Sequence, residues 1–428
     1  MKTIKSSVRA ASACLFILLA FSLLFHYYGY QNTWRLCSVP ALETHFADTL
    51  AITQAAETYA RGGDPLTFNP HDPEQMQIIY PALNWQVLNF MGINRSHTTG
   101  VALAFIIAFL TGVSLILPNA RAATIALVMA AVVSPAALLG AERGNLDLLL
   151  FFLVSCSIVA ARRVPFLSAS FALLGFALKL FPIFGCAVLL RLGKTTFFRY
   201  LAILVLALAA YTFLTFSDLV KILANAPVGI NGAYGLNVFW MGLESAVPAL
   251  GVYARILSYL LLALVFGCTI SALFRNDGPT EKSGDTPCLD AFRAGAAIYI
   301  GTFLLGSNFD YKLIFLIFTI PQLASWAKSS ARTLSIISQL TLFGLFLSLY
   351  YWVFMIRVAP LLPQGKAIVF ILDEMYNWGV FSTLLYLLLW SAPAWVKEVA
   401  QKTGPAIGQL ASVFTRKTGR SAAPGLRP

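Results

Sequence analysis

A single carboxylate, Asp48, occupies a position in which it could act as a general base. It follows the first long apolar run of the chain and has Phe46, Ala47, Leu50 and Ala51 as neighbours. A carboxylate at a lipid–water boundary is partly desolvated, which raises its pKa and makes it a stronger base toward a hydroxyl group. A helix cap or a solvated helix residue is the alternative interpretation. Three acidic residues of the same segment compete for the role: Glu43, Asp64 and Asp72.

The motif Gly-Ala-Glu-Arg-Gly-Asn-Leu-Asp, which ends at Asp147, carries more polar groups than a short connection between two apolar runs requires. Arg143 could bind a phosphate through two parallel hydrogen bonds. Asn145 and Asp147 are candidates for substrate binding or for capping the next helix, and Gly144 would let the backbone approach a ligand closely. The alternative is an ion pair of Arg143 with Glu142 or Asp147 that joins two helices.

Lys179 stands inside an apolar run, where a charge is costly unless it reaches the interface or pairs with an anion such as a phosphate. A third polar turn contains Asn308, Asp310 and Lys312. We expect these polar turns to lie on one side of the membrane. The predicted phosphate ligands are Arg143, Lys179 and Lys312. The predicted substrate contacts in these turns are Asn145, Asp147, Asn308 and Asp310.

Membrane helices must position these residues, because the composition excludes a soluble globule. The chain has 428 residues, of which 58% are hydrophobic and 11% charged, whereas soluble domains carry roughly 25% charged residues. Its mean hydropathy is +0.76. The net charge of +12 is dispersed between apolar runs, which argues against a nucleic-acid surface, and the six cysteines lack the spacing of a zinc site. We therefore predict an all-α, polytopic membrane protein.

The apolar runs predict about 11 to 12 membrane segments, because one span needs roughly 20 residues. The first run, 10–30, lacks a small-residue cleavage site and is predicted to be an uncleaved span. Most of the 30 Lys and Arg residues fall on the side that holds both termini, which the positive-inside rule makes cytoplasmic. The other simple runs are 98–117, 122–139, 146–161, 197–216, 252–274, 291–305, 313–327, 333–356 and 367–390.

One stretch, 164–190, is too long for a simple span and has basic residues at both ends. A single helix would place Arg191 on the face opposite to Arg162, against the positive-inside rule. We predict instead a broken hairpin of two short helices that meet near Lys179 and Pro182, because proline lacks an N–H group and clashes with the preceding turn.

This topology divides the chain into six parts, two of which are larger exterior segments. They are the first span (1–30), an exterior loop with Asp48 and interfacial helices over 44–60 and 81–90 (31–97), a core with the polar turn and the hairpin (98–216), a second exterior loop (217–251), a C-terminal bundle (252–391) and a basic cytoplasmic tail (392–428). The second loop is rich in Gly, Asn and aromatic residues, which suits either a sugar-contacting loop or an interfacial aromatic belt.

These motifs, in this order, resemble the GT-C glycosyltransferases that use polyprenyl-phosphate sugars, specifically glycosyltransferase family 87. The resemblance covers roughly the first half of the chain. It rests on Asp48, on Tyr-Ala-Arg-Gly-Gly-Asp-Pro-Leu over 59–66, on Tyr80-Pro81, on Glu-Arg-Gly-Asn-Leu-Asp over 142–147 and on Leu-Lys-Leu-Phe-Pro over 178–182.

The resemblance implies a GT-C-like fold and an inverting transfer of a hexose or pentose, with mannose as the first guess. The sugar would pass from a polyprenyl-phosphate donor to a glycolipid or glycan acceptor on the exterior face of a bacterial inner membrane. Asp48 would be the catalytic base, and Tyr80 would contact the substrate. No cofactor and no nucleic-acid partner are implied.

Three alternatives remain open at this point. A divalent metal could sit between Asp48 and Asp72 or Glu74, although no acidic cluster suited to one is evident. A lipid or solute transporter or flippase would also carry broken helices and buried charges, but the second half shows no repeat of the Lys-Leu-Phe-Pro break. A polysaccharide polymerase or ligase would place cations in a large late loop, whereas Lys221 is the only cation in 217–251.

Overall fold

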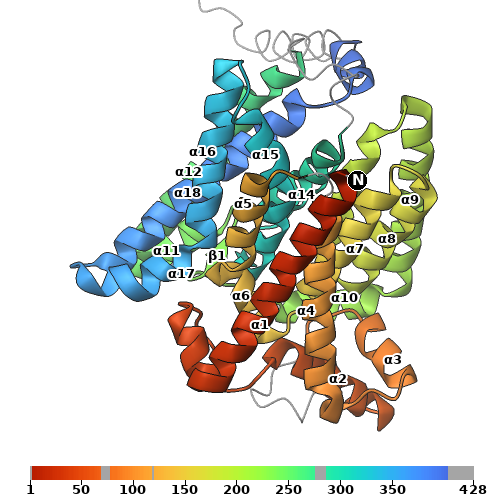
Figure 1. Cartoon of the computed structure of the whole chain (residues 1–428), viewed down its shortest axis with the longest axis vertical. Helices are drawn as coiled ribbons and strands as arrows, with labels where there is room; N and C mark the ends of the chain where they lie inside the picture. Colours follow the sequence, from red (N-terminus) through yellow and green to blue (C-terminus); the bar gives the residue numbers. More distant parts are fainter. Residues whose placement is uncertain (1, 69–77, 118–119, 275–285, 403–428) are drawn as a thin grey trace, which may run out of the picture.

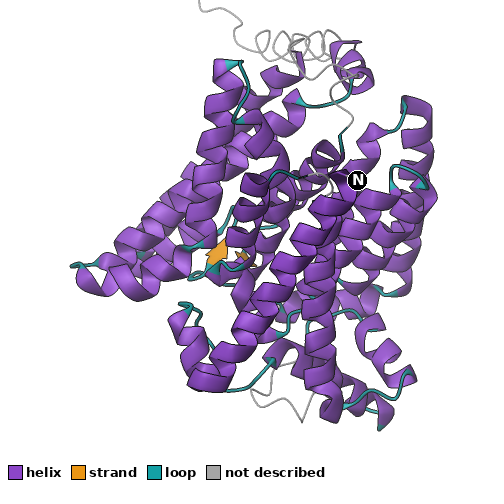
Figure 2. Ribbon diagram, viewed as in Figure 1, coloured by secondary structure: helices purple, strands orange, loops and turns teal. Residues whose placement is uncertain are grey.

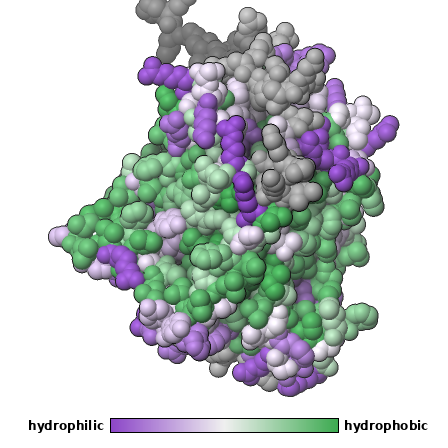
Figure 3. Space-filling view, in the orientation of Figure 1, coloured by the Kyte–Doolittle hydropathy of each residue, from purple (hydrophilic) through white to green (hydrophobic). Residues whose placement is uncertain are grey.

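The computed structural model describes residues 2–68, 78–117, 120–274 and 286–402. Helices make up nearly all of this part of the chain, and its only strands are two short ones (Figure 2). Figure 3 shows apolar residues in a broad band across the middle of the molecule, with hydrophilic residues gathered toward its two ends. The chain is a helical, membrane-embedded protein, as its composition predicts.

Six helices in the described residues are long and apolar enough to cross a membrane. A seventh candidate consists of α5 (Ala122–Val132) and α6 (Pro135–Arg143), which are bent by 53° where the chain passes Ser134. Shorter apolar helices make up much of the remainder, so the structure neither confirms nor excludes the count of about 11 to 12 segments. The six are α1 (Lys2–Leu36), α4 (Thr98–Leu115), α9 (Lys194–Leu214), α12 (Gly251–Ile270), α16 (Arg332–Leu349) and α18 (Gly365–Trp390).

The stretch 164–190 forms two short helices that fold back on each other. Helix α8 (Pro165–Leu178) ends where Lys179 adopts an extended backbone, and η2 (Phe181–Arg191) begins two residues later with Pro182 in its first turn. Arg162 and Arg191, at the two ends of the stretch, each lie 3.4 Å from the carboxylate of Asp290. A single straight helix would hold these two arginines roughly 40 Å apart. The stretch is therefore a hairpin, while the side from which it enters the membrane remains a prediction.

The first loop contains the two predicted helices, each starting a few residues later than expected. Helix α2 (Ala47–Ala60) begins only after Phe46, whose left-handed backbone (φ 53°) cannot belong to a right-handed helix. Helix α3 (Leu83–Phe90) begins after Pro81. Both lie at the end of the bundle opposite to the start of α1 (Figure 1). Helix α2 packs against α3, α4 and α6 and buries polar side chains, among them Thr53 and Gln54, so it is seated on the protein.

Two strands tie the second loop to the late polar turn. Strand β1 (Ala233–Tyr234) pairs antiparallel with β2 (Asn308–Phe309), with Ala233 opposite Phe309.

The core of the bundle is built around stacked aromatic rings such as Phe151 and Phe318, whose centroids are 4.1 Å apart. The remaining elements are η1 (Arg95–His97), α7 (Asp147–Ala160), α10 (Phe216–Asn225), α11 (Val238–Ala246), η3 (Pro248–Leu250), η4 (Ser271–Phe274), α14 (Pro287–Leu304), η5 (Asp310–Thr319), α15 (Ile320–Trp326), α17 (Tyr351–Val353), η6 (Phe354–Val358) and η7 (Ala359–Leu361).

Candidate functional site

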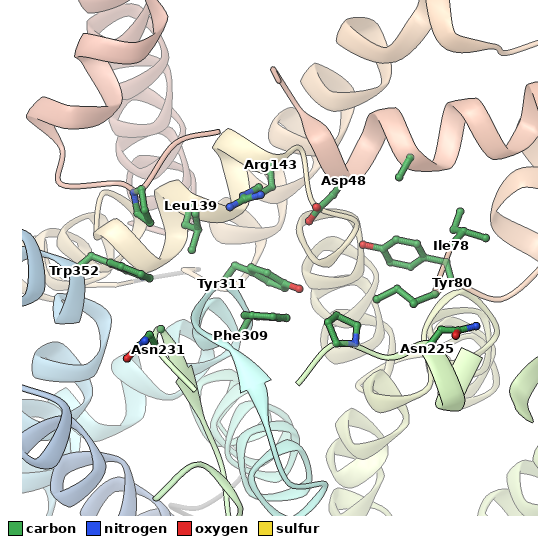
Figure 4. A pocket seen from close by; sticks show the side chains of 15 residues that line it. Asp48, Ile78, Tyr80, Leu139, Arg143, Asn225, Asn231, Phe309, Tyr311 and Trp352 are labelled. Carbon is green, nitrogen blue, oxygen red and sulfur yellow. The ribbon is translucent and has the colours of Figure 1, made fainter. Parts of the chain in front are cut away.

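A pocket of about 640 Å³ lies at the end of the bundle that carries α2 and α3. Figure 4 shows Asp48 and Arg143 on one side of it, Tyr311 and Phe309 across from them, and Trp352 and Tyr80 toward opposite ends. Among the described residues, Asp48 and Arg143 are the only charged ones in its walls. The walls are formed by Pro40, Asp48, Ala51, Ile78, Ile79, Tyr80, Leu139, Arg143, Asn225, Pro227, Asn231, Gly232, Phe309, Tyr311 and Trp352.

Asp48 is placed by the docking of α2 on the turn that precedes α7. It lies in the first turn of α2, one residue before Thr49, whose hydroxyl donates a hydrogen bond to the carbonyl of Gly144. Gly144 has a positive φ of 58°, and a Cβ there would collide with Thr49 and Ala102. We expected the missing side chain of Gly144 to let a ligand approach the backbone closely. In the structure, helix α2 makes that close approach. The close approach brings Asp48 beside Asn145, which lies 97 positions further along the chain.

The Asp48 carboxylate is a hydrogen-bond acceptor rather than a helix cap. The N-cap of α2 is Phe46, and no side chain caps it, whereas Oδ2 of Asp48 accepts a hydrogen bond from Nδ2 of Asn145. Burial raises the pKa of Asp48 above its ordinary value, and the positive charge of Arg143 and the Asn145 hydrogen bond offset part of that rise. These features suit a general base, because they increase basicity without removing the carboxylate from the pocket.

Arg143, at the end of α6, forms the ion pair that we listed as an alternative, yet it still faces the pocket. Its Nε lies 3.1 Å from Oε2 of the fully buried Glu142, and the other Glu142 oxygen accepts a hydrogen bond from the backbone of Leu42 at 3.0 Å. Among the described residues, the two terminal guanidinium nitrogens have no ion-pair partner. Arg143 can therefore present a fork of donors to an anion.

Lys179 lies behind the pocket wall and is neutralised there. Its Nζ donates to Oδ1 of Asp147 at 2.6 Å, and the Asp147 side chain is 1% exposed. Three aromatic rings surround the ammonium group, with centroids 5.3 to 5.7 Å from Nζ: those of Tyr80, Phe181 and Tyr311. The anion that pairs with Lys179 is thus a carboxylate of the protein. Lys179 contributes to the site through its positive charge and through its contacts with the three aromatic rings.

The third polar turn also faces inward. Asn308 and Asp310 are buried, and Nζ of Lys312 donates to Oδ1 of Asn308 at 2.6 Å. Phe309, which follows Asn308 in strand β2, and Tyr311, in the first turn of η5, line the pocket instead. Neighbouring residues of a strand point to opposite sides, so Phe309 faces the pocket while Asn308 faces the core. We predicted substrate contacts at Asn308 and Asp310, but the structure places their neighbours in the wall.

Of the other candidate residues of the first loop, some line the pocket and others lie away from it. Tyr80 lines the pocket as predicted, and burial together with the Asp48 charge raises its pKa, so its hydroxyl remains a donor. Glu43 is exposed and outside the wall, while Asp64 bonds to Nζ of Lys221 at 2.8 Å. Two residues invoked for the base or for a metal lie outside the described residues: Asp72 and Glu74.

Sequence reasoning missed the aromatic half of the pocket. Trp352 belongs to a run that looks like an ordinary membrane segment. Phe309 and Tyr311 alternate with the polar residues of the third turn, and the polar residues were chosen in their place. The second loop gave a usable signal, since its Asn231 and Gly232 do line the wall. No group of three or more His, Cys, Asp or Glu residues that could hold a metal occurs in the part of the chain that the structure describes.

Comparisons with known proteins place no relative beside this chain: no family model, no curated protein and no solved structure matches it.

Proposed function

We propose that the protein is an inverting glycosyltransferase that uses a polyprenyl-phosphate sugar as its donor. The observation that carries the proposal is the presence of one carboxylate, Asp48, and one guanidinium, Arg143, on the wall of a pocket whose other described lining residues are uncharged. The resemblance of the first-half motifs to glycosyltransferase family 87 supports the same reaction. The proposed location is a bacterial inner membrane, with the pocket on the exterior face.

The proposed reaction needs a base and an anion site. The acceptor oxygen forms a bond to the anomeric carbon of the donor, while the bond from that carbon to the phosphate oxygen breaks. Asp48 takes the proton from the acceptor hydroxyl, and Arg143 stabilises the negative charge that develops on the leaving polyprenyl phosphate. Lys179 and Lys312, which we expected to touch the phosphate, lie behind the wall and would act over a longer range.

The remaining walls fit a substrate that is part sugar and part lipid. Aromatic side chains such as Trp352 and Tyr311 present flat faces on which a pyranose ring can lie, and the amides of Asn225 and Asn231 can bond to its hydroxyls. The aliphatic side chains of Ile78 and Ile79 suit a hydrocarbon chain. Mannose remains the first guess for the sugar, and a glycolipid or glycan is the proposed acceptor.

The test is an assay of the purified full-length chain with a panel of polyprenyl-phosphate sugars. We expect release of polyprenyl phosphate with at least one donor, and its loss in Asp48→Asn. Glu43→Gln is a matched control, because it removes an exposed carboxylate of the same loop that is not part of the pocket wall. The proposal fails if no donor of the panel is consumed, or if both variants lose activity equally.

A second candidate function, transport of a lipid or polar solute, is favoured by two acidic residues inside α18. Asp373 and Glu374 are 6% and 2% exposed, and among the described residues no Lys or Arg pairs with either. Buried carboxylates without a counter-charge are common in proton- and ion-coupled transporters. Substrate uptake into proteoliposomes that is abolished by Glu374→Gln, without any polyprenyl phosphate release, would favour transport.

A further inference from the structure

Asn145 connects the polar turn before α7 to the Asp48 carboxylate. Its side chain is completely buried. Oδ1 accepts a hydrogen bond from the backbone N–H of Asp147 at 2.8 Å, and its own backbone N–H donates to the carbonyl of Gly140 at 2.9 Å. The side chain of Asn145 is therefore held through Oδ1, and its backbone is held through the bond to Gly140. This arrangement directs Nδ2 to Oδ2 of Asp48.

The two oxygens of Asp48 are consequently in different situations. Oδ2 is occupied by Asn145, while Oδ1 has no hydrogen-bond donor among the described residues, and Asp48 forms part of the pocket wall. A carboxylate that is fixed through one oxygen cannot rotate freely, so its second oxygen keeps one direction. Fixing a reactive group in this way lowers the entropic cost of reaching the reacting geometry.

Asn145 is itself fixed by the neighbouring ion pair. Asp147, whose N–H bonds to Asn145, accepts a hydrogen bond from Nζ of Lys179 at 2.6 Å. The chain of contacts runs from Lys179 through Asp147 and Asn145 to Asp48, and every member before Asp48 lies outside the pocket wall. Asn145, which was predicted as a substrate contact, is therefore connected to the pocket through Asp48.

We propose that Asn145 is a positioning residue, which holds Oδ2 of Asp48 so that Oδ1 faces the acceptor hydroxyl. This role rests on the proposed function of Asp48 as the base. The contact also favours the charged form of that base, because an amide N–H bonds more strongly to a carboxylate than to a neutral carboxyl group. The same contact thus orients the base and keeps it ionised.

The test compares Asn145→Ser with Thr53→Val in the full-length protein. Serine can still accept the bond from the Asp147 N–H and so retain the turn, but it is too short to reach Asp48. Thr53→Val removes the buried hydrogen bond of 2.7 Å between the hydroxyls of Thr53 in α2 and Thr98, and it leaves both Asn145 and the contact of Thr49 with Gly144 in place. Titration of the protonated-carboxyl band by infrared difference spectroscopy, with Asp48→Asn as the reference, reports on Asp48 without any substrate.

In Asn145→Ser we expect the midpoint of the Asp48 band to move up by about one pH unit, the effect of losing one donor. We also expect kcat to fall by about 10- to 100-fold, as for a displaced reacting group, with the acid limb of the pH profile displaced in the same direction. Thr53→Val should lower the melting temperature and leave the midpoint unchanged. An unmoved midpoint in Asn145→Ser overturns the proposal. A moved midpoint in a protein that consumes no donor refutes the transferase function and leaves the contact between the two side chains established.

Discussion

Replacing Lys179 by methionine should destabilise the protein, because it would leave the Asp147 carboxylate buried without its cation. The ammonium lies 2.6 Å from Asp147, and the two side chains are 16% and 1% exposed. Removing one partner of a buried pair typically costs about 3 to 5 kcal/mol, and the contacts with three aromatic rings add roughly 0.5 to 1 kcal/mol each where they are lost. At no more than roughly 2 °C per kcal/mol for a large domain, the loss of the ion pair should lower the melting temperature by up to about 10 °C, and the loss of all three ring contacts as well by up to about 16 °C.

The double variant Lys179→Met with Asp147→Asn separates the ion pair from the packing. Replacing both charges by neutral groups of similar size removes the stranded carboxylate, so most of the lost stability should return. Melting temperature and donor affinity are measured on the same samples. Lys179→Arg, which keeps the charge, should recover part of the stability. If Lys179→Met melts like the wild type and binds the donor at least tenfold more weakly, the ammonium belongs to the phosphate site and the interpretation of a structural pair is wrong.

Three further predictions follow from the same geometry. Asp48→Asn should lower turnover by about 100-fold or more without lowering the melting temperature at pH 7. Burial raises the pKa of Asp48, so the charged carboxylate lowers the stability of the folded state at every pH above the unfolded pKa. Asparagine carries no charge and removes that cost. Gly144→Ala should destabilise the fold by about 1 to 3 kcal/mol, since the left-handed backbone and the contact with Thr49 both oppose a Cβ; Gly100→Ala, where a Cβ meets nothing within 4 Å, is the thermal-unfolding control. A cysteine at Asp64 in a variant without the native cysteines should react with an impermeant thiol reagent on intact cells, and labelling that requires permeabilised membranes would contradict an exterior pocket.

Local patterns in the chain account for the membrane character and for several elements of the site. The apolar runs led directly to the long helices, because in a bilayer only a helix satisfies its own backbone. The hairpin could be predicted because Pro182 interrupts an apolar stretch with Arg162 and Arg191 at its ends. Asp48 was identified from its position after the first span and Tyr80 from the resemblance to a known family, and both line the pocket.

The partners of those residues were decided only by the tertiary structure. Asp48 meets Asn145 across 97 positions, and Lys179 meets Asp147 across 32; such pairings depend on how helices pack, which hydropathy does not encode. Whether a residue of a polar turn faces the pocket or the core depends on backbone direction, and for this reason Phe309 and Tyr311 form the wall where Asn308 and Asp310 were expected. The sequence by itself thus determined which segments enter the membrane and which charges needed an explanation, whereas packing decided which charge pairs with which, because contact across the bundle follows from shape complementarity rather than from distance along the chain.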